Sequence, residues 1–151
     1  MNKYLVLAAT CVGLIFSAST AQAAEPLAFQ QVMKDLGKHM QTITGAISRE
    51  DWELVERTAP SIAEHPQPPP AEKARIISFM GSNMGKFKGF DGETHEAAHE
   101  MLLAAQAKDG QKVIDSFQKV QSTCLACHQT FRVPFVAHFY GMQETENTRS
   151  R

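Results

Sequence analysis

The chain has 151 residues, which is enough for a single domain with one hydrophobic core. Its 15 basic and 16 acidic residues give a formal net charge of −1. This near-neutral balance argues against nucleic acid or an anionic membrane surface as a partner.

The first 23 residues have the features of a secretory signal peptide. Lys3 precedes an apolar stretch at 4–16, and Ala21-Gln22-Ala23 is a small-x-small cleavage pattern. The apolar stretch is too short for a comfortable membrane span, and no later segment approaches the roughly 20 apolar residues that a span needs. We therefore expect a cleaved signal peptide (1–23), a mature domain (24–151) without a stable membrane span, and export to the periplasm. An uncleaved N-terminal anchor is the alternative.

The first half of the mature chain predicts two helices and a break. From about Pro26 to Ile47, apolar residues recur at alternating steps of four and three, as on a helix packed in a bundle. Ser48 is predicted to cap a second helix with an apolar stripe from Trp52 to Ala63. The proline-rich run 65–70 ends that helix.

The second half predicts three further helical segments. One begins at about Ala71 and ends before a glycine-rich loop at 85–90. Asp91 is predicted to cap the next helix, which ends before a turn at Asp109-Gly110. The last helix is expected from about Gln111 towards Val133, and Pro134 is expected to end or kink it.

Antiparallel helices joined by short loops, each with one apolar stripe, pack most simply as a four-helix bundle. The predicted fold class is all-α, with up-down-up-down topology.

Cys124-Leu125-Ala126-Cys127-His128 is the C-x-x-C-H pattern of c-type haem attachment. On a helix, positions i, i+3 and i+4 project from one face. Two thiols can therefore add to the two vinyl groups of a haem while the adjacent imidazole reaches the iron. The motif predicts one covalent haem c, held by Cys124 and Cys127, with His128 as the proximal iron ligand.

Two other uses of paired cysteines fit less well. A thioredoxin-like redox pair is expected at the start of a helix that follows a strand, and this pair lies late in a helical chain. A structural zinc site requires four ligands, and the other histidines are scattered. His95 and His99 share a helical face and are interpreted as surface residues.

The segment 124–132, CLACHQTFR, lies near the C-terminus of an exported four-helix chain. In this respect the chain resembles the class II cytochrome c family, the cytochrome c′ group. Phe131 is expected to pack on the porphyrin. Arg132 is expected either to approach a haem propionate or to remain a solvated charge.

The family resemblance also indicates where the sixth iron ligand lies. In family members the residue over the distal face is on the first helix, and it is either apolar, leaving the iron open, or a Met. The stretch 29–34, FQQVMK, resembles that region and places Met33 at the ligand position, with Phe29 replacing the usual Arg. Bundle register independently sets His128 level with about Met33, while Met40 lies roughly 10 Å further along the axis. Met33 is thus the predicted ligand, Met40 the second candidate and an open iron the third.

These features predict a non-enzymatic periplasmic one-electron carrier with His/Met ligation. We locate no paired carboxylates or nucleophile–base arrangement that would indicate an enzyme, although an open haem can show weak peroxidase-type activity. The alternative is a five-coordinate haem protein that binds small gases, nitric oxide or carbon monoxide. The redox partner protein is unknown, and the family resemblance makes a homodimer through the first two helices a further expectation.

Overall fold

The computed structural model describes residues 27–141, so the predicted signal peptide lies outside the described residues. Within the described range the regular structure is entirely helical, with no strand. The elements are α1 (Ala28–Ile47), α2 (Trp52–Thr58), α3 (Pro60–Ala63), α4 (Pro70–Met80), a 3₁₀ turn (Gly81–Asn83), α5 (Met84–Gln106), α6 (Gly110–Cys127), a π-helical turn (His128–Arg132) and α7 (Val133–Tyr140).

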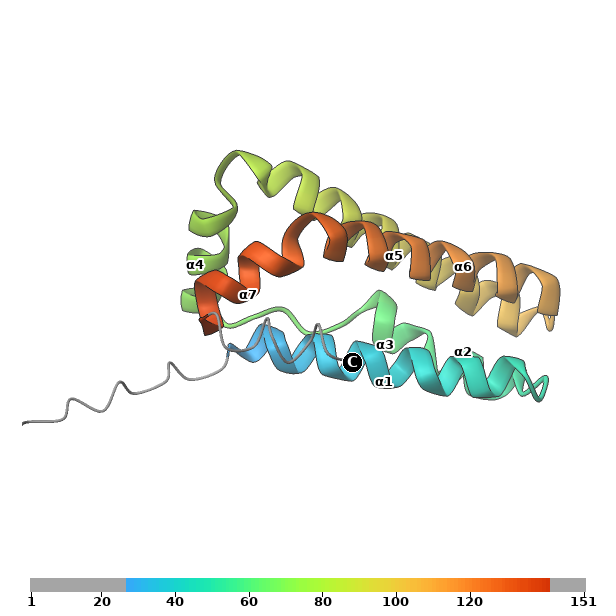
Figure 1. Ribbon diagram of the computed structural model, residues 1–151. Helices are drawn as coiled ribbons and strands as arrows, with labels where there is room; N and C mark the ends of the chain where they lie inside the picture. Colours follow the sequence, from blue (N-terminus) through green and yellow to red (C-terminus); the bar gives the residue numbers. More distant parts are fainter. Residues whose placement is uncertain (1–26, 142–151) are drawn as a thin grey trace, which may run out of the picture.

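Four helical segments form the bundle, as predicted. Figure 1 shows α1 lying against α2 and α3 in one layer, with α5 and α6 side by side in the other. α4 stands across one end of the bundle, and α7 bends from the end of α6 towards the start of α1. None of the described helices is both long and apolar enough to cross a membrane.

Most of the interior belongs to one apolar cluster, which we call the bundle core. It includes residues from α1, α2, α3, α5 and α6, and the predicted alanine-rich stripe of α5 is a large part of it. Its fully or almost fully buried members are Ile43, Ala46, Val55, Ala59, Ile62, Ala97, Ala98, Met101, Ala104, Ala105, Val113 and Val120.

A second cluster closes the end of the bundle where α4 and α7 lie, and we call it the aromatic cluster. Its buried members are Leu27, Ile76, Met80, Phe131, Phe135 and Phe139, and Phe29, Phe79, Phe87 and Phe90 pack against them. The ring centroids of Phe29 and Phe135 are 5.5 Å apart, so the first turn of α1 contacts α7.

The start of α1 is fixed by a residue of α4. Leu27, the residue before the helix, provides no side-chain cap. Instead, the backbone N–H groups of Ala28 and Phe29 donate to the two carboxylate oxygens of Glu72, at 2.8 and 2.7 Å. Because the first N–H groups of a helix have no partner within it, Glu72 both satisfies them and places a negative charge at the positive end of the helix dipole.

The predicted cap of the second helix was wrong. Ser48 is the C-terminal cap residue of α1, and its hydroxyl donates to the Gly45 carbonyl at 2.9 Å. Asp51 caps α2 instead, by accepting from the Leu54 N–H at 3.0 Å. Glu50, with a φ of 55°, makes the reversal between the two helices.

The predicted glycine-rich loop is also wrong, because α5 runs without interruption from Met84 to Gln106. Glycines at 85, 89 and 92 weaken a helix. However, Phe87 and Phe90 lie three residues apart and both pack against the aromatic cluster, so tertiary packing compensates for the poor propensity. Asp91 is consequently an interior residue of α5 and not its cap.

The last helix changes its winding at the attachment motif. α6 ends at Cys127, five residues form a π-helical turn, and α7 continues to Tyr140. Pro134, in the first turn of α7, has no N–H to donate, and its ring clashes with the carbonyl four residues earlier in a regular helix. The expected kink is thus a wider turn that begins at His128.

Candidate functional site

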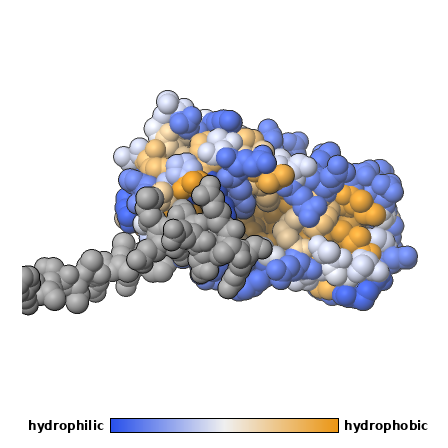
Figure 2. Space-filling model, viewed as in Figure 1, coloured by the Kyte–Doolittle hydropathy of each residue, from blue (hydrophilic) through white to orange (hydrophobic). Residues whose placement is uncertain are grey.

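The two cysteines of the motif contact different parts of the interior. Both are partly buried at the end of α6 and free of disulfide bonds. Cys124 packs against the bundle core, whereas Cys127 packs against the aromatic cluster. The motif therefore lies at the boundary between the two clusters. Figure 2 shows apolar side chains set back between hydrophilic margins in the middle of the molecule.

The environment of the thiols does not suit dithiol redox chemistry. Burial raises the pKa of Cys124, and burial followed by the charges of Cys124 and Asp91 raises the pKa of Cys127 to about 11. Reactive cysteines of thioredoxin-like pairs have lowered pKa values. In the haem-free chain, both thiols are thus protonated near neutral pH.

His128 begins the π-helical turn directly after Cys127. Its side chain is solvent-accessible, yet desolvation of the ring, with a smaller effect of the Arg132 charge, lowers its pKa. The imidazole is therefore neutral near pH 7 and has a nitrogen lone pair free for a metal. π-helical turns occur frequently at functional sites.

Phe131 and Arg132, three and four residues after His128, differ in their burial. Phe131 is buried, with its ring centroid 5.7 Å from that of Phe87 and 6.3 Å from that of Phe90. Arg132 is exposed. The expected contacts of Phe131 with a porphyrin and of Arg132 with a propionate stay predictions.

The two candidate methionines of α1 also have different environments. Met40 is partly buried and packs against the bundle core. Met33 is partly buried too, but it belongs to neither cluster. Phe29, one turn earlier, packs against the aromatic cluster, and Leu36, almost one turn later, packs against the bundle core. Met33 thus lies at the boundary of the two clusters on α1, as the cysteines do on α6.

Residues 25–132 match the family model of cytochrome c′. This range covers most of the chain and ends just after the C-x-x-C-H motif. The chain belongs to the cytochrome c′ family. A comparison with curated proteins found no significant match.

Members of the cytochrome c′ family bind one covalent haem c with its iron, and this cofactor is accordingly assigned to the chain. The described residues fit it. Two free thiols and a neutral imidazole follow one another at the end of α6, and apolar surface lies on both sides of them. When bound, the haem supplies an iron that changes charge by one electron.

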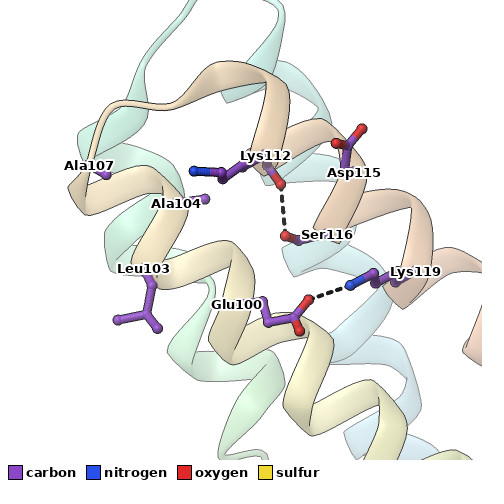
Figure 3. A pocket seen from close by; sticks show the side chains of 8 residues that line it. All are labelled: Glu100, Leu103, Ala104, Ala107, Lys112, Asp115, Ser116 and Lys119. Atoms are coloured by element: carbon purple, nitrogen blue, oxygen red, sulfur yellow. Dashed lines mark hydrogen bonds and ion pairs between the residues drawn. The ribbon is translucent and has the colours of Figure 1, made fainter.

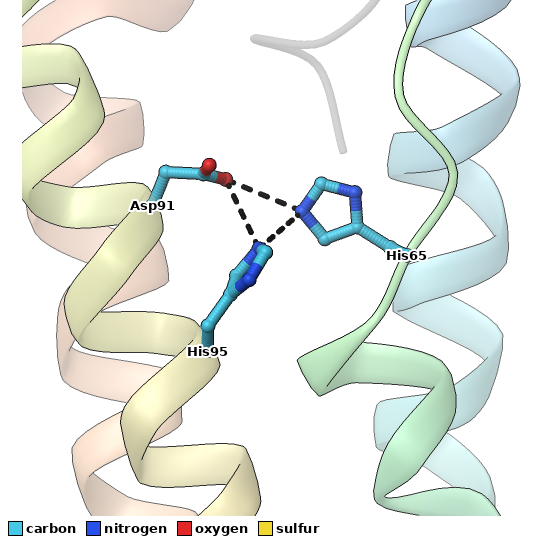
Figure 4. Close-up of side chains that lie close together, drawn as sticks. All are labelled: His65, Asp91 and His95. Carbon is cyan, nitrogen blue, oxygen red and sulfur yellow. Dashed lines mark hydrogen bonds and ion pairs between the residues drawn. The ribbon is translucent and has the colours of Figure 1, made fainter.

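The sequence reasoning missed one group of side chains in this cytochrome c′ relative. His65, in the proline-rich segment between α3 and α4, meets Asp91 and His95 of α5 (Figure 4). His65 is buried and His95 half-buried, so His95 is not the surface residue that was expected. The hydrogen bond between His65 and Asp91 raises the pKa of His65 and lowers that of Asp91. Asp91 and His95 are four residues apart on α5, and this spacing indicated that they form a pair. Nothing in the sequence indicated that His65 joins them.

A pocket of about 420 Å³ lies between α5 and α6 (Figure 3). The Lys119–Glu100 ion pair, at 2.7 Å, lies at its edge. On α6 its lining ends at Lys119, so neither cysteine contributes to it. This pocket is therefore separate from the attachment motif.

Proposed function

We propose that this member of the cytochrome c′ family is a periplasmic one-electron carrier. Cys124 and Cys127 hold its haem, and His128 and Met33 ligate the iron. The observation that carries the proposal is the position of Met33, half-buried on α1 and outside both apolar clusters. Its thioether is not committed to core packing, whereas that of Met40 is.

The register of α1 against the C-terminal helices supports the same choice. Phe29 contacts Phe135, which fixes one level of the bundle. Counted along α1 from Phe29, Met33 is four residues further, about 6 Å along the helix axis, and Met40 is about 16 Å further. His128 comes seven residues before Phe135, about 10 Å at most. Met33 is therefore closer in level to His128 than Met40 is.

The surrounding residues suit an electron carrier. A thioether opposite an imidazole favours reduced iron and raises the potential of the couple. The bundle core and the aromatic cluster provide apolar surface on either side of the motif, and the proposed ligands lie on helices that pack against them. Small structural change between the two charge states favours rapid transfer of a single electron.

Replacement of the two methionines by alanine tests the assignment of the sixth ligand. With Met33→Ala we expect a change to high-spin iron that binds carbon monoxide, while Met40→Ala keeps the wild-type spectrum. If Met33→Ala leaves the spectrum unchanged and Met40→Ala does not, Met40 is the ligand. If the wild type already binds carbon monoxide, the alternative of a gas-binding, five-coordinate protein holds.

Periplasmic location and partners are part of the same proposal. Export through residues 1–23 places the chain where covalent haem attachment occurs, and the expected partner is another redox protein. Fractionation of cells that express the full chain tests the location, since mature protein lacking those residues should appear in the periplasmic fraction. The predicted homodimer remains a separate expectation, which sedimentation of the haem-loaded protein tests.

A further inference from the structure

One side-chain atom from each of His65, Asp91 and His95 forms a compact triangle beside the attachment motif. His65 Nε2 lies 3.2 Å from Asp91 Oδ1 and 2.9 Å from His95 Nε2, and His95 Nε2 lies 3.5 Å from the same Asp91 oxygen. Tetrahedral Zn²⁺ with bonds of about 2.0–2.1 Å sets its ligand atoms about 3.3 Å apart. The three observed edges bracket that value, so one ion would fit against all three atoms.

The three side chains are held in place by their own segments. Asp91 and His95 are four residues apart on α5 and therefore share one face of that helix. His65 is 9% exposed, and the prolines that follow it restrict the backbone of its segment. In Figure 4 the side chains of α5 and of the His65 segment point towards one another. The triangle consequently needs no rearrangement to receive an ion.

A backbone contact of His65 fits the second layer of a metal site. Its Nδ1 lies 3.2 Å from the Pro66 carbonyl oxygen, which can only accept a hydrogen bond. In the neutral ring, Nδ1 therefore carries the hydrogen and Nε2 offers its lone pair to the triangle. Histidines that ligate metals almost always donate their other N–H in this way, which fixes the tautomer and the ring orientation.

The donor types indicate which ions suit the site. Imidazole nitrogen is a ligand for Zn²⁺, Cu²⁺, Ni²⁺ and other transition metals, whereas Mg²⁺ and Ca²⁺ take oxygen ligands. Without an ion, the lone pairs of the two Nε2 atoms and of the carboxylate oxygen would repel one another unless protons lie between these atoms. A divalent cation satisfies all three acceptors at once.

We propose that His65, Asp91 and His95 bind one divalent transition-metal ion, of which Zn²⁺ is the representative, with a fourth position open to water. This ion is distinct from the haem iron, which the function proposed above assigns to His128. Asp91 is nevertheless close enough for its charge to raise the pKa of Cys127. The site thus adjoins the haem-attachment segment.

Zinc titration of the purified haem-loaded protein tests the proposal. After treatment with a chelator, we expect calorimetry to show one tightly bound Zn²⁺ ion per haem. Excess Zn²⁺ should also raise the melting temperature of the protein. His65→Ala and Asp91→Asn should each weaken binding by about tenfold or more. An unchanged haem spectrum in these variants shows that the fold and the haem site are intact, whatever the sixth iron ligand is.

His99→Ala is the matched control, because His99 is an exposed residue one turn after His95 on the same helix. It should bind Zn²⁺ like the wild type. If His99→Ala loses the ion and His65→Ala keeps it, the ion sits on a surface pair of His95 and His99, and the proposal is wrong. Absence of stoichiometric Zn²⁺ in the haem-loaded wild type would also overturn it. If one variant fails to fold, the other still decides between these results.

Discussion

The indole ring of Trp52 occupies the space where a side chain at Gly110 would begin. A Cβ atom built at Gly110 would lie 2.8 Å from two carbons of that ring, closer than real Cβ atoms approach. Trp52 begins α2 and Gly110 begins α6, so this contact joins the two layers at the end of the bundle away from α4. Glycine at this position is required by the close approach of the ring.

We therefore expect Gly110→Ala to destabilise the protein by about 1–3 kcal/mol, the usual cost of overpacking. Gly37→Ala on α1 is the control, because a Cβ there meets nothing within 4 Å. It should stabilise the helix by about 0.5–1 kcal/mol. Urea denaturation measures both. Equal effects of the two substitutions would contradict the contact, and a smaller ring in Gly110→Ala/Trp52→Phe should recover part of the loss.

The cap of α6 predicts a dependence of stability on pH. Hydrogen bonds from the Lys112 side chain and backbone N–H hold the pKa of Asp109 below its usual value. A lowered folded-state pKa adds stability above the unfolded value of about 3.9, and this stability is lost as the pH falls through the folded value. Asp109→Ala should therefore lower the melting temperature at pH 7 but not in strong acid.

Asp109→Asn is the matched variant for that experiment. Its amide oxygen still accepts from the Lys112 N–H, but it carries no charge. At pH 7 we expect a smaller loss in melting temperature than for Asp109→Ala, and this loss should shrink in strong acid, because the wild-type carboxylate is then protonated. A loss that is the same at pH 7 and in strong acid in both variants would show that the carboxylate charge contributes nothing.

The link between Glu72 and the start of α1 predicts a further loss of stability. Glu72→Ala leaves the N–H groups of Ala28 and Phe29 without their carboxylate partner. We expect a cost of about 1–2 kcal/mol in the free energy of unfolding, similar to that of losing a helix cap. Glu93→Ala, at an exposed position of α5, is the control and should cost little. Hydrogen exchange should show faster opening of the first turn of α1 in Glu72→Ala alone.

Single and double cysteine variants test the assignment of the thiols. Cys124→Ser or Cys127→Ser removes one of two thioether bonds, and the double variant removes both. We expect haem to remain on the denatured polypeptide in the single variants, in reduced yield, and to be absent from it in the double variant. A haem stain of a denaturing gel measures this. Haem that stays covalently bound in the double variant would contradict the assignment.

The sequence predicts the fold well because the apolar stripes are regular. The α1 stripe and the alanine-rich stripe of α5 have helical spacing over many residues, and both lie in the bundle as expected. The local glycine content wrongly predicts a loop at 85–90. That segment is helical because Phe87 and Phe90 pack against phenylalanines that are distant in the sequence. The π-helical turn follows from Pro134 only in part, because a proline predicts a kink but not its form.

The candidate site likewise contains residues that the sequence predicts and residues that depend on the tertiary structure. Cys124, Cys127 and His128 are local in sequence, and their spacing alone indicates their use. The environment of Met33 depends on which cluster each turn of α1 contacts, so the sequence could only rank it above Met40. The meeting of His65 with Asp91 depends on the path of an irregular proline-rich segment, which no periodicity describes.

The optical absorption spectrum of the purified wild-type protein, oxidised, then reduced and finally exposed to carbon monoxide, tests the central claim most directly. Ligation by His128 and Met33 predicts a low-spin haem c spectrum with a weak far-red sulfur-to-iron band and no response to carbon monoxide. A high-spin spectrum that shifts with carbon monoxide would contradict the electron carrier and leave Met33 as a packing residue.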